Sequence, residues 1–328
     1  MQAPQFRPTI GPEDAPKLIA VQDARREADD VRHGLSFEYL PTLNGYRQKL
    51  ENDDPNDWII VQSGSEVVGY GYLVPSWAEH NGRQVYLHLG WMKPAARGQG
   101  IGRELLARLE ARCHEKAVQE GKADNAEYAA NASGTEVSAQ HLLRASGYSA
   151  IYTAIEMRFT PTQVTSLPLP EGLTLRPVLP EHHRALWQCI GDAYYVHGAD
   201  NRGRQIPTED DYNRYFKSDS ADPSLWFVAW EPSRIAGVVL CRIENDVADV
   251  YEVSVAHAHR RKGLAKALLT TALAELRRRN VSAIRLITWR ENPSAAWRLY
   301  ESVGFETIKE FPRWRKPWIQ HPGVNTIE

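Results

Sequence analysis

The sequence predicts two tandem domains of mixed α/β class, each an α+β arrangement built on a mixed sheet. Its 328 residues are enough for two compact cores. One order of strands and helices occurs twice along the chain, which indicates an internal duplication. Each copy places β-rich segments before a glycine-containing turn and a long helix with one apolar face.

Matched landmarks support the duplication. An Arg-Pro motif that opens a strand occurs at Arg7-Pro8 and again at Arg176-Pro177. Each copy ends in a helix that stops at a glycine followed by an aromatic residue, Gly147-Tyr148 or Gly304-Phe305. Between the copies, TPTQVTSLPLP is typical of an extended linker. We therefore predict an N-terminal domain at 1–160, a linker at 161–172 and a C-terminal domain at 173–328.

The same elements are expected in the same order in both copies. The second copy is expected to contain strands at 226–230, 235–241, 249–255 and 284–288, a helix from residue 264 and a helix at 294–303. The first copy is expected to contain strands at 58–62, 67–73 and 85–91 and a helix from about residue 100. A mixed sheet with covering helices follows for each copy.

Composition excludes several classes of protein. A net charge of −2, from 39 basic and 41 acidic residues, gives no general attraction for nucleic acid or an anionic membrane. The three cysteines have no paired or metal-ligand spacing, so we expect reduced thiols, no metal site and a cytoplasmic setting. Without an apolar N-terminal segment or an apolar run of roughly 18 residues, the protein is expected to be soluble and without a signal peptide.

The strongest chemical signal is the turn before the long helix. It reads Arg97-Gly98-Gln99-Gly100-Ile101-Gly102 in the first copy and Arg260-Arg261-Lys262-Gly263-Leu264-Ala265 in the second. Such a turn presents backbone N–H groups at the positive end of a helix dipole, where a pyrophosphate binds. Its glycines permit close approach, and its first arginine adds positive charge beside the anion. One such turn could equally cap a surface helix, but two in matching context favour phosphate binding.

Two runs of the second copy resemble motifs of the GNAT acetyltransferases. VSVAHAHRRKGLA at 253–265 resembles their acetyl-CoA-binding motif, and NPSAAWRLYESVGF at 292–305 resembles the motif that follows it. The likeness covers nearly the whole chain as two units, in a tandem form similar to mycothiol-synthase-like acetyltransferases. It implies an acyl-CoA-dependent N-acetyltransferase with acetyl-CoA as cosubstrate and a small-molecule amine as acceptor. The alternative is a non-catalytic CoA-binding sensor or interaction module.

The resemblance also implies roles for single residues. In this family the turn, here Arg260 to Ala265, holds the pyrophosphate, and the backbone of Val253 and Val255 pairs with pantetheine. Asn292 would contact the cofactor near pantetheine, and Tyr300 would protonate the departing CoA thiolate.

The reaction also needs a base, because only a neutral amine attacks the thioester. Asp249 and Glu252 lie on the strand that enters the turn, and their odd spacing predicts that they face opposite sides of the sheet. Asp249 matches the position of a glutamate base in some histone-type members of the family. The alternative for each acid is a solvated or ion-paired residue. His257 is either a proton relay or an exposed spacer.

The first copy departs from the family pattern. Leu143 stands where the second copy has Tyr300, and Thr135 stands where it has Asn292. We therefore expect the C-terminal domain to be catalytic and the N-terminal domain to hold CoA without catalysis or to be empty. Tyr128 or Tyr148 could replace the missing acid, and the alternative is that both are core or surface residues.

The acceptor pocket is expected within 191–225, the segment between the first two strands of the second copy. Its aromatic and acidic residues would suit a cationic amine with an apolar body. The alternative is that the acids mark helix N-termini. The residues concerned are Tyr194, Tyr195, Tyr212, Tyr215, Phe216, Asp192, Asp200, Glu209, Asp210 and Asp211. A P-loop or Rossmann protein is excluded by the absence of a G-x-x-x-x-G-K-[ST] motif.

Overall fold

The computed structural model describes residues 3–32, 34–35, 37–38, 40–79, 82–160, 164–194, 208–217 and 221–318. The chain divides into two compact units. Unit 1 comprises Met1–Thr153 and Glu310–Glu328, and unit 2 comprises Ala154–Lys309. Each unit is a mixed sheet with helices, so the predicted fold class is confirmed. Within the described ranges, no helix is both long and apolar enough to cross a membrane.

Unit 1 is built on one sheet with helices on both faces. Strands β1, β2, β3 and β5 pair antiparallel in that order, and β5 then pairs parallel with β6. Helices α1 and α2 pack in a core on one face of this sheet, and α3 packs in a core on the other. The elements are β1 (Gln5–Arg7), α1 (Ala15–Arg25), α2 (Leu43–Asn52), β2 (Trp58–Ser63), β3 (Glu66–Leu73), β4 (Trp77–Ala78), β5 (Gln84–Met92), α3 (Ile101–Gln119), β6 (Ala126–Asn131) and α4 (Val137–Ala145).

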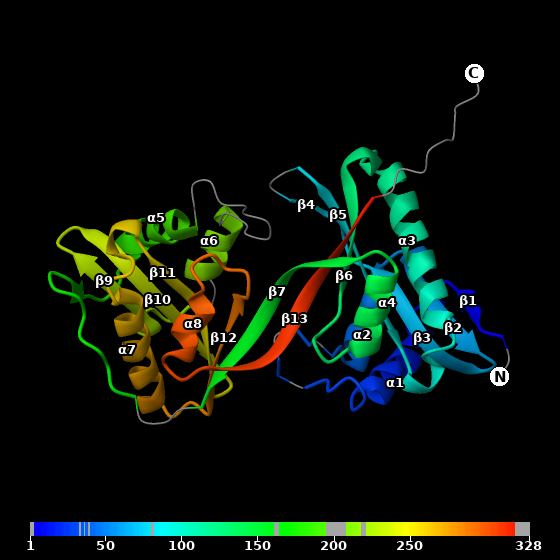
Figure 1. Cartoon of the computed structure of the whole chain (residues 1–328), viewed down its shortest axis with the longest axis horizontal. Helices are drawn as coiled ribbons and strands as arrows, with labels where there is room; N and C mark the ends of the chain where they lie inside the picture. Colours follow the sequence, from blue (N-terminus) through cyan, green and yellow to red (C-terminus); the bar gives the residue numbers. More distant parts are fainter. Residues whose placement is uncertain are drawn as a thin grey trace, which may run out of the picture. The chain divides into compact units, whose positions relative to one another are not determined.

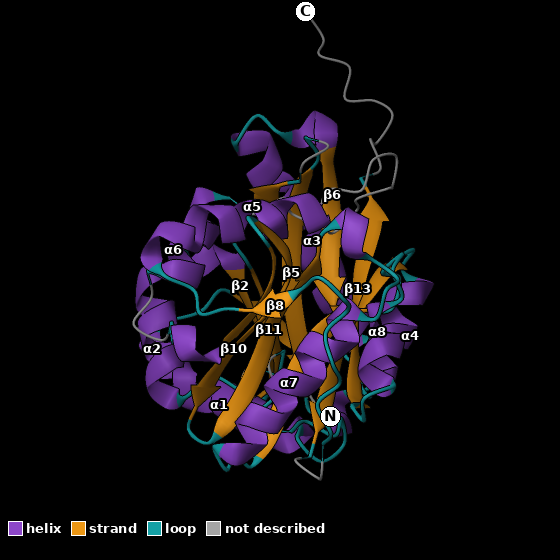
Figure 2. Cartoon of the chain, turned by 90° about the vertical axis from the view of Figure 1, so that its left-hand side faces the viewer, coloured by secondary structure: helices purple, strands orange, loops and turns teal. Residues whose placement is uncertain are grey.

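Unit 2 repeats this plan. Strands β8, β9, β10 and β11 pair antiparallel, and β11 pairs parallel with β12. Figure 2 shows β10 and β11 side by side; α7 packs on one face of them, and α5 and α6 pack on the other. The elements are β8 (Thr174–Leu175), α5 (His183–Tyr194), α6 (Glu209–Phe216), β9 (Trp226–Glu231), β10 (Arg234–Glu244), β11 (Val247–Val255), α7 (Leu264–Arg278), β12 (Ala283–Trp289) and α8 (Ala296–Glu301).

The two units exchange their last strands. Strand β7 (Ser149–Phe159) ends the first copy in sequence, yet its second half, from Ala154, pairs antiparallel with β12 of unit 2. Strand β13 (Glu306–Pro317) ends the second copy, yet Arg313–Pro317 pairs antiparallel with β6 of unit 1. In Figure 1 these two strands, green and red, each continue from one unit into the other. Each compact unit therefore contains a strand from the other sequence copy, so the units differ in extent from the predicted segments 1–160 and 173–328.

The segment predicted as a linker packs against unit 2. Residues 161–163 lie outside the described residues. Val164, Leu169 and Leu173 pack against the core beneath α7, and the Leu167 N–H donates to Thr270 Oγ1 at 3.1 Å. The described part of this segment is therefore packed on the surface of unit 2.

Candidate active site

The two predicted phosphate turns, Arg97–Gly102 and Arg260–Ala265, have one backbone geometry. Gly98 and Gly100 have φ of +73° and +83°, and the matching positions in unit 2, Arg261 and Gly263, have φ of +59° and +82°. Gly100 caps α3 and Gly263 caps α7, each in the left-handed region. A Cβ built on Gly98, Gly100 or Gly263 would meet no atom within 4 Å. Both turns are thus open in front of helix N–H groups that have no intrahelical partner, as a bound pyrophosphate requires.

The first arginine of each turn also donates hydrogen bonds to protein groups. In unit 2, Arg260 donates from Nε to Val255 O (3.1 Å) and from Nη2 to Ala193 O (2.8 Å). In unit 1, Arg97 contacts Met92 O in the same way and also binds Asp29. These guanidinium groups tie the turn to the end of the preceding strand. In unit 2 the exposed Arg261 and Lys262 remain to carry positive charge beside the turn.

The strand that enters each turn separates from its parallel neighbour. In unit 2, β11 pairs with β12 only from Val247 to Asp249. The Ala256 N–H donates to Ala236 O of β10, so alternation along β11 directs the peptide groups of Val253 and Val255 away from β10 and toward the gap. In unit 1, β5 pairs with β6 only as far as His88. A gap between parallel strands therefore exists beside each turn.

A β-bulge changes the side-chain alternation of β11. Leu240 pairs with Glu252, but the next residue of β10, Cys241, pairs with Val250, so Tyr251 is an extra residue. The side chains of Val250 and Val253, which are three residues apart on either side of this bulge, consequently share the α7 face. The prediction that Asp249 and Glu252 face opposite sides of the sheet is therefore wrong, because the bulge turns both toward the α5 and α6 face.

Glu252 lies in a buried polar cluster beside the gap. Its side chain is only 3% exposed. Oε1 accepts a hydrogen bond from the Ser254 hydroxyl at 2.6 Å, and Oε2 accepts one from the Tyr215 hydroxyl of α6 at 3.2 Å. A buried carboxylate with neutral hydroxyl donors can accept a proton without first breaking an ion pair with either of them.

Asp249 is held in ion pairs. It accepts a hydrogen bond from Arg242 Nε of β10 at 3.1 Å and another from Arg285 of β12. This is the ion-paired alternative left open for it by the sequence. The two guanidinium groups therefore hold this carboxylate in place between β10 and β12.

Tyr300 lies on α8 and is 7% exposed, with its ring against Phe305 at 6.1 Å between centroids. Burial, and to a smaller extent the charge of Glu252, raises the pKa of Tyr300 above its usual value. Its hydroxyl is therefore protonated at neutral pH and lies close enough to Glu252 for an electrostatic interaction with that carboxylate. Asn292 begins the turn into α8, where its Oδ1 accepts hydrogen bonds from Ser294. His257 is exposed.

Unit 1 has apolar residues at the positions that correspond to Glu252, Ser254 and Tyr300. Counting by the 163-residue separation of Arg97 and Arg260, Leu89 matches Glu252 and Trp91 matches Ser254. Leu143, which matches Tyr300, is a core residue. Tyr148 is buried, and its hydroxyl lies 2.7 Å from His88 Nε2.

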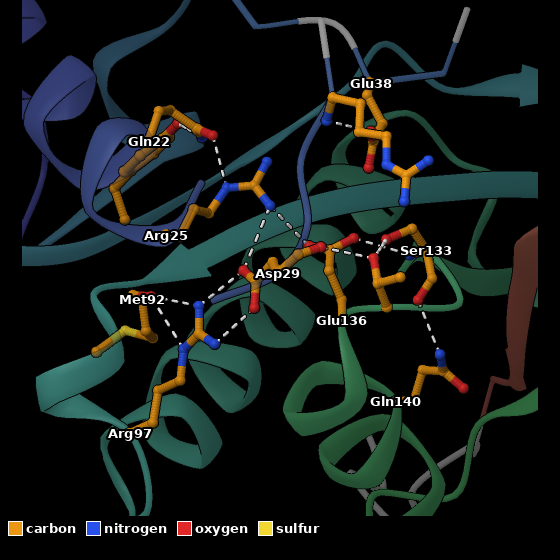
Figure 3. Close-up of polar contacts among 12 residues, drawn as sticks. Gln22, Arg25, Asp29, Glu38, Met92, Arg97, Ser133, Glu136 and Gln140 are labelled. Atoms are coloured by element: carbon orange, nitrogen blue, oxygen red, sulfur yellow. Dashed lines mark hydrogen bonds and ion pairs between the residues drawn. The ribbon is translucent and has the colours of Figure 1, made fainter. Parts of the chain in front are cut away.

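An ion network occupies the α1 side of the gap in unit 1 (Figure 3). Asp29 binds Arg97 through both carboxylate oxygens, at 2.7 and 2.8 Å. Arg25 lies between Asp29 and Glu136, at 3.5 and 3.0 Å, and its guanidinium stands over the Trp91 ring at 5.3 Å. Arg25, Asp29 and Glu136 have side chains no more than 14% exposed.

The same network contains Thr135, the residue that matches Asn292. Its hydroxyl donates to Asp29 O at 2.5 Å and lies 3.2 Å from Ser133 Oγ. Glu136 also accepts from the Ser133 N–H at 2.8 Å. The network therefore links the end of α1, the phosphate turn and the start of α4.

The predicted acceptor segment is only partly described. Tyr195 and Asp200 lie outside the described residues, as does the side chain of Tyr194. Tyr212 and Phe216 are buried in the core between α5, α6 and the sheet. Among the acids, Asp211 completes a capping box with Thr208, and Glu209 forms an ion pair with Arg184. These two acids stabilise the start of α6, which is the alternative that the sequence left open.

Sequence reasoning did not identify Ser254 and Tyr215 as hydrogen-bond partners of Glu252. It also did not identify Leu89 as the unit 1 residue at the position of Glu252. Ser254 could have been found from its position two residues further along the same strand. Leu89 could have been found by applying the repeat spacing to Glu252. Tyr215 carries no sequence signal that distinguishes it from the neighbouring aromatic residues, because only the packing of α6 brings its hydroxyl to the carboxylate.

Comparisons with known proteins agree with this geometry. The profile of the Acetyltransferase (GNAT) family matches residues 21–147 and 187–305. The mycothiol acetyltransferase of Thermobispora bispora is 27% identical over 309 residues, which cover 92% of this chain and 95% of that protein. The mycothiol acetyltransferase of Streptomyces avermitilis is 25% identical over 303 residues, covering 91% and 90%.

Solved structures share the fold. A GCN5-related N-acetyltransferase from Sphaerobacter thermophilus has a TM-score of 0.72 at 22% identity, covering 98% of this chain and 99% of that one. A tandem GNAT protein from the clavulanic acid biosynthesis pathway has a TM-score of 0.57 at 17% identity, covering 97% and 99%. This chain belongs to the GNAT acetyltransferase family, with two GNAT domains in tandem. It is an acyl-CoA-dependent N-acetyltransferase.

Proposed function

We propose that unit 2 transfers an acetyl group from acetyl-CoA to the amine of a small molecule, while unit 1 does not catalyse transfer. The observation that carries the proposal is the presence of Glu252 and Tyr300 in unit 2, at positions where unit 1 has Leu89 and Leu143. The names of the mycothiol acetyltransferase relatives support a small-molecule acceptor.

The chain's own groups suit each part of this reaction. The open turn from Arg260 to Ala265 would hold the pyrophosphate on backbone N–H groups, and the backbone of Val253 and Val255 would pair with pantetheine in the gap. Acetyl-CoA supplies the thioester carbonyl. Glu252, directly or through water, takes the proton that the amine must lose as its nitrogen bonds to that carbon.

Two further groups stabilise the charges that then develop. The backbone N–H of Val255, directed into the gap, would donate to the oxyanion of the tetrahedral intermediate. When the carbon–sulfur bond breaks, the thiolate takes a proton from the Tyr300 hydroxyl. Asp249 is assigned a structural role, because its ion pairs with Arg242 and Arg285 occupy it.

The residues of unit 1 support a non-catalytic role for this unit. Its turn from Arg97 to Gly102 has the same open geometry as the turn of unit 2, so we propose that it can hold CoA. At the positions of Glu252 and Ser254 it has Leu89 and Trp91, and the Arg25 guanidinium stands over the Trp91 ring.

Two isosteric variants test the assignment, with CoA thiol release measured on an amine found active with the parent protein. Glu252→Gln and Tyr300→Phe should each reduce turnover by roughly 100-fold or more, around the range that general acid–base groups supply. Asp249→Asn is the matched control on the same strand and should retain most activity if folded. Parental turnover by Glu252→Gln would show that another group removes the proton.

A further inference from the structure

The Glu252 carboxylate receives hydrogen bonds from two different elements of unit 2. Ser254 donates from β11 itself, so its position is fixed relative to Glu252 by the strand. Tyr215 donates from α6, which packs on the same face of the sheet. The hydrogen bond to Oε2 therefore depends on where α6 places the Tyr215 hydroxyl.

Aromatic packing fixes that hydroxyl. The Tyr215 ring lies edge-on to Trp187 of α5 at 5.5 Å and edge-on to Tyr251, the bulge residue of β11, at 5.2 Å. It also contacts Phe216, which is buried against Trp226. Because three elements surround the ring, its hydroxyl has little freedom to turn away from Glu252.

The start of α6 is fixed as well. The Thr208 hydroxyl accepts from the Asp211 N–H, and Asp211 accepts from the Thr208 N–H. Arg184 of α5 donates to both carboxylate oxygens of Glu209, at 2.7 and 2.9 Å. The helix that carries Tyr215 is thus capped and connected to α5.

The Tyr215 hydroxyl is in the protonation state that a hydrogen-bond donor to Glu252 needs. Burial and the charge of Glu252 raise the pKa of Tyr215 well above its usual value, so the phenol stays protonated at neutral pH. A hydroxyl that donates to a carboxylate favours the ionised form of that carboxylate, whereas burial alone favours the neutral form.

We propose that Tyr215 is a positioning residue for acetyl transfer, whose hydroxyl holds the Glu252 carboxylate oriented and ionised beside the gap. This inference rests on the proposed function, since holding the carboxylate matters to catalysis only if Glu252 is the base. It assigns the acceptor-side helix α6 a part in the chemistry, because this helix supplies a hydrogen bond to the base.

Other titratable groups around Glu252 must be kept constant in a test. Tyr300 approaches from α8, and Tyr251 from β11 itself; Glu252 contributes to the raised pKa of each. Cys189 approaches from α5, and burial, followed by the charges of Asp192 and Glu252, raises the pKa of its thiol. Tyr251→Phe is the matched control, because it removes a hydroxyl from a ring that touches Tyr215 but leaves the Tyr215–Glu252 hydrogen bond in place.

The test is a carbon-13 NMR titration of the full chain labelled at the glutamate side-chain carboxyl carbons. The Glu252 signal is assigned as the one missing from Glu252→Gln. We expect Tyr215→Phe to move the Glu252 titration midpoint upward by about one pH unit, since a hydrogen bond to a charged group contributes about 1.5 kcal/mol or more. Tyr251→Phe should leave that midpoint near its parental value.

An unchanged midpoint in Tyr215→Phe, or equal movement in both variants, would overturn the proposal. This readout needs no acceptor and no turnover, so it is independent of the proposed function. Failure of the proposed function would show itself separately, as full acetyl transfer by Glu252→Gln.

Discussion

The carboxylate of Asp29 accepts two hydrogen bonds from the guanidinium of Arg97, at 2.7 and 2.8 Å. The Asp29 side chain is 5% exposed, and Arg25 shares it from the other side. This pair connects the phosphate turn of unit 1 to the segment that follows α1. Unit 2 makes the corresponding connection differently, through a hydrogen bond from Arg260 to a backbone carbonyl of α5.

Asp29→Asn should lower the free energy of unfolding by about 3 kcal/mol, because it removes the negative charge shared by the buried Arg25 and the partly buried Arg97. Urea unfolding of the full chain measures this. The control is Glu104→Gln, which removes a pair with Arg108 whose side chains are about half exposed. That change should cost less than about 1 kcal/mol. Equal small effects of both variants would mean that the network contributes little to stability.

The buried His88 should make unit 1 acid-sensitive. Burial, with a smaller contribution from nearby Lys316, lowers the pKa of His88 to about 3. Above the ordinary histidine pKa of about 6.5, the folded and unfolded chains are both neutral at this residue. Below it the unfolded chain binds a proton that the folded chain does not, so stability falls as the pH drops from about 6.5 toward 3.

His88→Gln should therefore reduce the dependence of the unfolding free energy on pH in that window by up to about 1.4 kcal/mol per pH unit. Urea unfolding at pH 7, 6 and 5 measures the dependence, and His141→Gln, at an exposed position, is the control. The assignment fails if His88→Gln and the parent protein lose stability in parallel over this range.

The strand exchange predicts what happens when the chain is cut. Cleavage at an engineered protease site within 161–163 would separate β7 from the sequence that follows it. The fragments should stay associated in gel filtration, because Ala154 to Phe159 pairs with β12 and Arg313 to Pro317 pairs with β6. Expressed alone, each fragment should fail to give a stable monomer. Two independently folded monomers would contradict the exchange.

The sequence predicted local elements well and long-range pairings poorly. Leu264, Leu268, Ala272 and Leu276, expected on one apolar face, are all buried, since helical periodicity depends only on nearby residues. The identity of a strand's partner leaves no such periodic signal, so the exchange of β7 and β13 was not anticipated. The bulge at Tyr251 was missed because a single extra residue breaks the alternation on which the faces of Asp249 and Glu252 were judged.

Catalysis of acetyl transfer by unit 2 requires an intact turn at Gly263. Gly100→Asp and Gly263→Asp test this requirement directly, because both glycines have nearly the same φ and both face open space. Each substitution places a carboxylate where a phosphate would bind, so damage to the turn is matched between the two variants. Circular dichroism should confirm that each variant is folded.

The decisive measurement is the rate of CoA thiol release by these two variants with the same amine acceptor. We expect Gly263→Asp to abolish release and Gly100→Asp to retain most of the parental rate. Loss of activity in Gly100→Asp together with full activity in Gly263→Asp would contradict this expectation and make unit 1 the catalytic unit.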